Sequence, residues 1–171
     1  MDPRVMTSDC TLRYATAADL PRIATLWRAL YEHQLAHGMR LPVPAGAFEA
    51  WERSMAPALG RFAVVSLAER EGAIVGFVAG RVRALPPFFG GGAAGFISEV
   101  FVSDTERGTG LGRQVLAHAV DWFAAQGITR VELQVLAGNP RALEFYRELG
   151  WHEELVQMVW EAPAVTRTGG S

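Results

Sequence analysis

Three glycines at alternate positions stand directly before a long amphipathic run, in the stretch RGTGLG at residues 107–112. Glycine loses more conformational freedom on folding than any other residue, so the cluster indicates a special backbone path or a ligand that approaches the main chain closely. The run at about 110–126 predicts a helix with one apolar face that Gly127 ends. The stretch FISEVFVS at 96–103 predicts a buried strand. Strand, glycine-rich turn and helix therefore follow one another.

The start of that helix predicts an anion site. The first backbone N–H groups of a helix have no acceptor within it, and the helix dipole favours negative charge there. Arg107 or Arg113 can add a charge-assisted contact to a phosphate. The alternative is a tight turn with close helix packing. A dinucleotide fingerprint GxGxxG fails because Arg113 stands in place of its third glycine. The chain has no lysine, which excludes a GxxxxGK[ST] loop and a pyridoxal phosphate enzyme.

The remaining patterns predict one mixed α/β domain, a sheet layer covered by helices. Before the glycines they indicate a strand at 11–15, a helix from Leu20, a shorter helix ending near Pro57 or Leu59, a β-hairpin of 61–69 and 73–84, and a loop at 85–95. After the glycines they indicate a strand at 129–136, a helix at 141–149 and a last strand at 152–160. Strands that alternate with helices in this way are expected to run parallel.

Composition narrows the class of protein further. The chain has 171 residues, a net charge of -2 and no basic arm, which argues against nucleic acid as a partner. No apolar run approaches the length of a membrane span, and the first residues lack the apolar core of a signal peptide, so we expect a cytoplasmic protein. The single Cys10 cannot form an internal disulfide. His33 and His37 have helical spacing but no third ligand beside them, so we expect no metal.

A family resemblance rests on several of these positions together. Arg107, Gly110 and Gly112 fit the spacing R-x-x-G-x-G, and Asn139 and the closing stretch YRELGW follow downstream. This pattern resembles the GNAT-type N-acetyltransferases, whose acetyl-coenzyme A signature is [QR]-x-x-G-x-[GA]. The resemblance covers 11–160, with 1–10 and 161–171 as expected flexible ends. It implies a single domain with a central, mixed, mostly antiparallel sheet, a parallel strand pair at the acetyl-coenzyme A site, and about four flanking helices.

The resemblance also implies an activity, which is direct attack of a primary amine on the thioester of acetyl-coenzyme A. Backbone N–H groups near a splayed or bulged strand end are then expected to face the thioester carbonyl. The residues implied in coenzyme A binding are Phe101, Val102, Arg107, Gly108, Thr109, Gly110, Leu111, Gly112, Arg113 and Asn139.

Two side chains are candidates for proton transfer. Glu99 lies in the middle of a buried strand, where a carboxylate is costly unless it is paired or useful, and the resemblance implies a base that acts through water. A structural ion pair with an arginine is the alternative. Tyr146 is the implied general acid for the departing sulfur, with packing on the apolar helix face as the alternative. Asn139 is expected to cap its helix as well.

The acceptor is less constrained: we expect a primary amine of a small molecule or a peptide, and prefer a small-molecule amine over protein lysine. Tyr31, Glu32 and Glu99 are the candidate acceptor contacts, and Glu32 or Glu49 is expected to attract a cationic acceptor. The loop at 85–95 is a candidate wall of the acyl or acceptor pocket. Three alternatives remain compatible with the sequence: a catalytically silent acyl-coenzyme A sensor in place of an enzyme, an acyl donor larger than acetyl-coenzyme A, and a homodimer in place of a monomer.

Overall fold

The computed structural model describes residues 10–162, and its five strands form one sheet in chain order. Neighbouring strands pair antiparallel except for the last two, which pair parallel. The strands are β1 (Cys10–Tyr14), β2 (Ala63–Arg70), β3 (Ala73–Ala84), β4 (Ala93–Val102) and β5 (Val131–Leu133). This topology confirms the expected mixed, mostly antiparallel sheet with one parallel pair.

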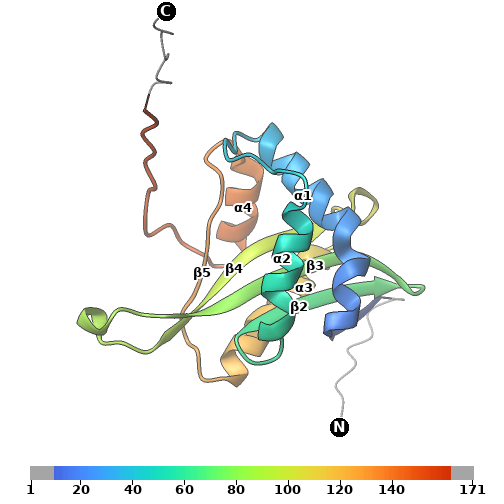
Figure 1. Cartoon of the computed structure of the whole chain (residues 1–171), viewed down its shortest axis with the longest axis horizontal. Coiled ribbons are helices and arrows are strands. Elements are labelled where there is room, and N and C mark those ends of the chain that lie inside the picture. Colours follow the sequence, from blue (N-terminus) through green and yellow to red (C-terminus); the bar gives the residue numbers. More distant parts are fainter. Residues whose placement is uncertain (1–9, 163–171) are drawn as a thin grey trace, which may run out of the picture.

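Helices cover both faces of the sheet, as Figure 1 shows with α1 and α2 in front and α3 behind. The α-helices are α1 (Ala24–Ala36), α2 (Ala47–Met55), α3 (Leu111–Ala125) and α4 (Pro140–Glu148). Trp27 of α1 and Phe48 of α2 share one core with Phe77 of β3. Phe123 of α3 belongs to a second core on the opposite face, where α4 contributes Phe145. The sheet therefore separates two apolar cores.

Two strand glycines set how closely α3 lies on the sheet. A Cβ atom at Gly95 of β4 would lie 2.8 Å from Cδ1 of Phe123, and one at Gly80 of β3 would lie 3.1 Å from its Cζ. Only glycine leaves room for the fully buried Phe123 ring at these positions. The glycines thus fix the long helix against the strand that precedes it in the chain.

Several predicted boundaries differ from those observed. Residues 17–23 form a 3₁₀ helix that contains Pro21, and α1 begins only at Ala24 because proline cannot donate an intrahelical hydrogen bond. β4 begins at Ala93, inside the segment that sequence patterns predict as loop. Within residues 10–162 no helix is long and apolar enough to cross a bilayer.

The predicted last strand at 152–160 is wrong. These residues are in neither helix nor strand, and all of them are exposed. The apolar alternation is present, but a strand needs a partner edge to satisfy its backbone groups, and none pairs with this segment in the described part of the chain. Of the expected flexible ends, Cys10 belongs to β1 and is buried. Residues 1–9 and 163–171 lie outside the described residues.

Candidate functional site

A bulge in β4 turns Glu99 toward α1. Ala79 of β3 pairs with Glu99 and the next residue, Gly80, pairs with Ile97, so Ser98 is an extra residue in β4. A bulge of one residue reverses which face the following side chains occupy. Ile97 therefore packs in the core under α3, whereas Phe101 belongs to the core under α1. The sequence predicts a splayed or bulged strand near residues 101 and 102, and the bulge lies at Ser98.

Glu99 is buried and held by neutral donors. Its side chain accepts a hydrogen bond from the Tyr31 hydroxyl at 3.0 Å and another from the Ser98 hydroxyl. The Trp51 side chain is a further donor. Burial raises the pKa of Glu99 above the ordinary range of glutamate, and these hydrogen bonds oppose the shift. The charge of Arg81 also lowers the pKa of Glu99, but within residues 10–162 no arginine forms an ion pair with it, so its surroundings differ from those of a structural salt bridge.

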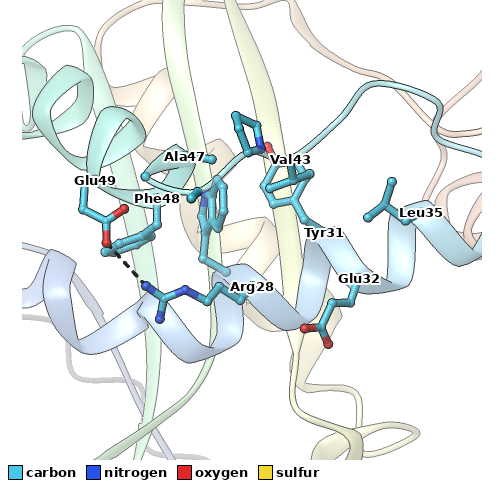
Figure 2. A pocket seen from close by; sticks show the side chains of 12 residues that line it. Arg28, Tyr31, Glu32, Leu35, Val43, Ala47, Phe48 and Glu49 are labelled. Carbon is cyan, nitrogen blue, oxygen red and sulfur yellow. Dashed lines mark ion pairs between the residues drawn. The ribbon is translucent and has the colours of Figure 1, made fainter.

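A cavity of about 310 Å³ lies between α1 and the segment 43–49 (Figure 2). Tyr31 lines the cavity and donates to Glu99, so its hydroxyl connects the two. Trp27 also lines the cavity, and its indole Nε1 is buried without a hydrogen-bond partner among the described residues. A buried donor without a partner is uncommon in folded proteins.

The two acidic residues of the cavity differ in their partners. Figure 2 shows Glu49 turned toward Arg28, with which it forms an ion pair at 3.5 Å. Arg28 also lies over the Phe48 ring, 5.4 Å from its centroid. Glu32 has no ion pair among the described residues, and Figure 2 shows it on the outer side of α1. Glu32 therefore attracts a cationic ligand more strongly than Glu49 does, because no neighbouring cation among the described residues offsets its charge.

The strands β4 and β5 separate beyond Ile97. Their parallel pairing covers only residues 95–97 of β4, which leaves the β5-facing edge of the rest of β4 without a strand. The Ser103 N–H donates to Val75 on the β3 side at 2.8 Å. Successive N–H groups of a strand point to opposite edges, so the Val102 N–H faces the open edge and the Phe101 N–H faces β3. The open edge offers hydrogen-bonding groups to a ligand.

The glycine cluster leads from β4 into α3. Gly108 and Gly110 have φ values of 78° and 85°, a left-handed conformation in which side chains are strained, and Gly110 is the residue before the helix. Thr109 donates to the Glu106 carbonyl at 2.7 Å, and its hydroxyl accepts from the Leu111 N–H at 3.3 Å. These contacts keep the turn rigid.

The first turn of α3 has free main-chain donors. The first α-helical hydrogen bond runs from the Gln114 N–H to the Gly110 carbonyl at 3.3 Å. The N–H groups of Gly112 and Arg113 precede it and therefore have no acceptor within the helix. A Cβ atom at Gly112 would meet only the Phe145 ring, at an ordinary 3.7 Å. The protein's own packing therefore tolerates a side chain there. Arg113 is exposed, and Arg107 forms an ion pair with Asp104 at 2.8 Å.

Tyr146 lies in α4, and Asn139 directly precedes that helix. Asn139 caps the helix, since its side-chain oxygen accepts from the Ala142 N–H at 3.1 Å, which confirms the expected cap. The Tyr146 ring packs against Phe145 and Trp151, with centroids 5.1 and 6.0 Å away. Burial raises the pKa of Tyr146 to about 12, so its phenol is protonated near neutral pH.

The structure also relocates or adds candidates. The loop 85–95 contributes nothing to the cavity, because β3 and β4 extend as a hairpin that carries the loop to the far end of the sheet (Figure 1). Sequence patterns alone did not identify Ser98, Trp51 or the unpaired Trp27 nitrogen, and no motif could have found them. Within residues 10–162 no three His, Cys, Asp or Glu side chains cluster as a metal site would require.

Comparisons with known proteins agree on one family. The model of the Acetyltransferase (GNAT) family matches residues 21–151. A mycothiol acetyltransferase from Thermobispora bispora is 36% identical over 97 residues, 55% of this chain and 32% of that protein. An L-methionine sulfoximine/L-methionine sulfone acetyltransferase from Pseudomonas paraeruginosa is 27% identical over 142 residues, 82% of this chain and 79% of that one.

Among solved structures, an aminoglycoside N-acetyltransferase in complex with CoA superposes with a TM-score of 0.74 at 18% identity, covering 95% of this chain and 99% of that chain. At that identity the likeness shows a shared fold. The match to the mycothiol acetyltransferase spans only about a third of that relative's length.

Proposed function

Because the chain belongs to the GNAT acetyltransferase family, we propose that it transfers the acetyl group of acetyl-coenzyme A directly to the amine of a small molecule. The observation that carries this proposal is Glu99. A buried carboxylate, without an ion-paired arginine among the described residues, accepts hydrogen bonds from Ser98 and from Tyr31, which lines the cavity. A perturbed carboxylate in such a position suits a general base.

The first turn of α3 is the proposed diphosphate site. The free N–H groups of Gly112 and Arg113 and the positive end of the helix dipole suit an anion. Packing within the chain does not require glycine at 112, so the missing side chain is better explained by a ligand close to the backbone. Arg113 is exposed and suits a charge-assisted contact. Arg107 can contribute once it is released from Asp104.

The open edge of β4 is the proposed place of the thioester. Acetyl-coenzyme A bound there supplies an activated acyl group. The Val102 N–H faces that edge and can stabilise negative charge on the thioester oxygen. Phe101 was also expected to supply an N–H, but strand alternation directs its amide toward β3. We therefore propose Val102 as the donor and Phe101 as a packing residue beneath it.

Two side chains divide the proton transfers. Glu99 removes a proton from the ammonium group of the acceptor, through a water or directly, and its raised pKa makes it a better base than an exposed glutamate. Tyr146 keeps its proton near neutral pH because its pKa is about 12, and it can give that proton to the departing sulfur. Asn139 caps α4 and so fixes the helix that carries the phenol.

The cavity between α1 and residues 43–49 is the proposed acceptor site. Its volume of about 310 Å³ is at the lower end of the range for small-molecule pockets, which favours a compact amine over a folded peptide. Glu32 suits a positive charge. The names of relatives that act on methionine sulfoximine and on L-2,4-diaminobutyric acid support a small acceptor.

The test measures thiol release from acetyl-coenzyme A in the presence of a panel of amines. The panel contains small amino acids, diamines, aminoglycosides and peptides with a free N-terminus. We expect turnover with a compact amine and none with the peptides. Coenzyme A binding without turnover on any amine would instead support an acyl-coenzyme A sensor. Preference for a longer acyl thioester would leave the mechanism intact and change the donor.

The role of Glu32 has a matched control in the same cavity. Glu32→Gln is expected to raise the KM of a cationic acceptor, whereas Glu49→Gln is expected to change it less because Arg28 already compensates that charge. An unchanged KM in both variants would remove the electrostatic part of the proposal. The KM for acetyl-coenzyme A should stay constant in both.

A further inference from the structure

Glu106 is the one buried residue in the turn that leads from β4 into α3. All other residues of the range 104–110 are exposed. A Cβ atom at Gly108 or Gly110 would meet nothing within 4 Å beyond its chain neighbours, so packing does not hold the glycines in place. Glycine is also the residue that loses most conformational freedom when it is ordered. Between its two ends, the turn is therefore held mainly through Glu106.

The Glu106 carboxylate joins this turn to the sheet. It accepts two hydrogen bonds from the guanidinium of Arg70, the last residue of β2, at 3.0 Å from Nε and 3.1 Å from Nη2. The two nitrogens donate to different carboxylate oxygens. A pair of this kind fixes the orientation of both groups as well as their distance.

The main chain of Glu106 links the same pair to the start of α3. Its N–H donates to the Ser103 carbonyl at 3.0 Å, and its carbonyl accepts from the Thr109 hydroxyl at 2.7 Å. The Thr109 hydroxyl accepts in turn from the N–H of Leu111, the first residue of α3, at 3.3 Å. A continuous series of hydrogen bonds therefore runs from Arg70 in the sheet to the first turn of the helix.

We propose that the Arg70–Glu106 pair positions the diphosphate site, an inference that rests on the proposed function. The N–H groups of Gly112 and Arg113 follow directly after this series of hydrogen bonds, and a diphosphate can bind them only when the turn is in place. The pair acts through the main chain, so Arg70 and Glu106 are positioning residues.

The expected effect on affinity follows from the ordering of the turn. A turn that is held in its binding geometry before the ligand arrives lowers the ordering cost of binding. If the turn is released from β2 and keeps that geometry about a tenth of the time, the Kd for coenzyme A rises about tenfold.

Glu69 provides a matched control beside the pair. It precedes Arg70 in β2, and successive side chains of a strand point to opposite faces of the sheet. Its carboxylate accepts from Arg13 and from Arg22, each at 2.7 Å. Glu69→Gln and Glu106→Gln each replace a carboxylate that is paired with arginine, but only Glu106 belongs to the glycine-rich turn.

Calorimetric titration with coenzyme A measures the effect on binding. Glu106→Gln should raise the Kd about tenfold, whereas Glu69→Gln should leave it at the wild-type value. Arg70→Gln should raise the Kd by a similar factor. The double variant should raise it no further, because all three changes break the same contact. Circular dichroism of each variant checks that folded proteins are being compared.

Steady-state kinetics separate positioning from a general loss of structure, because acetyl-pantetheine has the same thioester without the diphosphate. In Glu106→Gln the KM for acetyl-coenzyme A should rise, while kcat at saturation and kcat/KM for acetyl-pantetheine should stay at their wild-type values. An equal loss with both donors would overturn the inference, as would an unchanged Kd for coenzyme A in Glu106→Gln and Arg70→Gln. A wild type without affinity for coenzyme A would overturn the proposed function as well.

Discussion

The hydrogen bond from Tyr31 to Glu99 allows us to predict how the activity depends on pH. Burial raises the pKa of Glu99, and the Tyr31 hydroxyl lowers it by stabilising the ionised form at 3.0 Å. Tyr31→Phe removes that donor, so the pKa of Glu99 rises further and the acidic limb of kcat moves to higher pH. The ring and its packing against Trp27 are kept.

The size of the effect follows from the type of bond. A hydrogen bond to a charged group contributes about 1.5–3 kcal/mol, and each 1.4 kcal/mol is about a factor of ten. On the acidic limb kcat of Tyr31→Phe should therefore fall about ten- to a hundredfold. On the alkaline plateau, where Glu99 is ionised in both proteins, kcat should change little.

The assay is the initial rate of thiol release at saturating acetyl-coenzyme A, measured from mildly acidic to mildly alkaline pH. Tyr14→Phe is the matched control, because its hydroxyl donates to the His118 carbonyl at 3.0 Å, away from Glu99. Its profile should equal that of the wild type. An acidic limb that stays in place in Tyr31→Phe would refute the assignment of that limb to Glu99.

Glu99→Gln completes the same prediction. It should lower kcat by about 10²–10⁴ and abolish the acidic limb. The raised pKa means that the folded protein binds the Glu99 proton more tightly than the unfolded chain does. Binding of that proton stabilises the folded state fully at a pH below the pKa of Glu99 in the unfolded chain. This stabilisation is lost as the pH rises through the pKa of Glu99 in the folded protein. The variant should therefore exceed the wild type in unfolding free energy near neutral pH and lose the advantage in acid.

Three further predictions concern other positions. Tyr146→Phe should lower kcat by about 10²–10⁴ and leave coenzyme A affinity and thermal stability unchanged, because only the phenolic hydroxyl is lost and the ring keeps its packing. Asp19→Asn should lower the free energy of unfolding in denaturant by about 1–3 kcal/mol, because the carboxylate accepts from Arg13 at 2.7 and 2.8 Å. The pKa of Asp19 is lowered chiefly by Arg13, so the difference should persist from neutral pH into mild acid and vanish only as pH falls through that lowered pKa. Gly138→Ala should cost about 1–3 kcal/mol in the same assay, since its Cβ would lie 2.3 Å from the His37 carbonyl oxygen; full stability would contradict that contact.

Local patterns predicted the elements whose own residues determine them. The hairpin strand 73–84 and the helix after the glycines are observed within a residue of their predicted bounds, because turn glycines and apolar periodicity fix them locally. The last strand at 152–160 fails for the opposite reason. A strand depends on a partner edge, and nothing in its own residues shows whether one is paired with it.

In the candidate site, too, the features set by neighbouring residues could be predicted from the sequence, whereas those set by tertiary pairing could not. The left-handed turn at Gly110 and the helix cap at Asn139 could be predicted from local residues, and the family from several motif positions taken together. The direction in which Glu99 points could not, because it depends on the bulge at Ser98, which arises from pairing with a strand about twenty residues earlier. Two donors to Glu99, Tyr31 and Trp51, come from α1 and α2, so only the folded chain brings them to the carboxylate.

The central claim is that main-chain donors at the start of α3 bind a nucleotide-linked diphosphate. Calorimetric titration of the wild-type chain with coenzyme A and, separately, with pantetheine tests this most directly, because pantetheine shares the thiol arm and lacks the diphosphate. The account predicts saturable binding of coenzyme A and a much weaker response to pantetheine. Equal affinity for the two, or no heat with coenzyme A even at millimolar concentration, would contradict it.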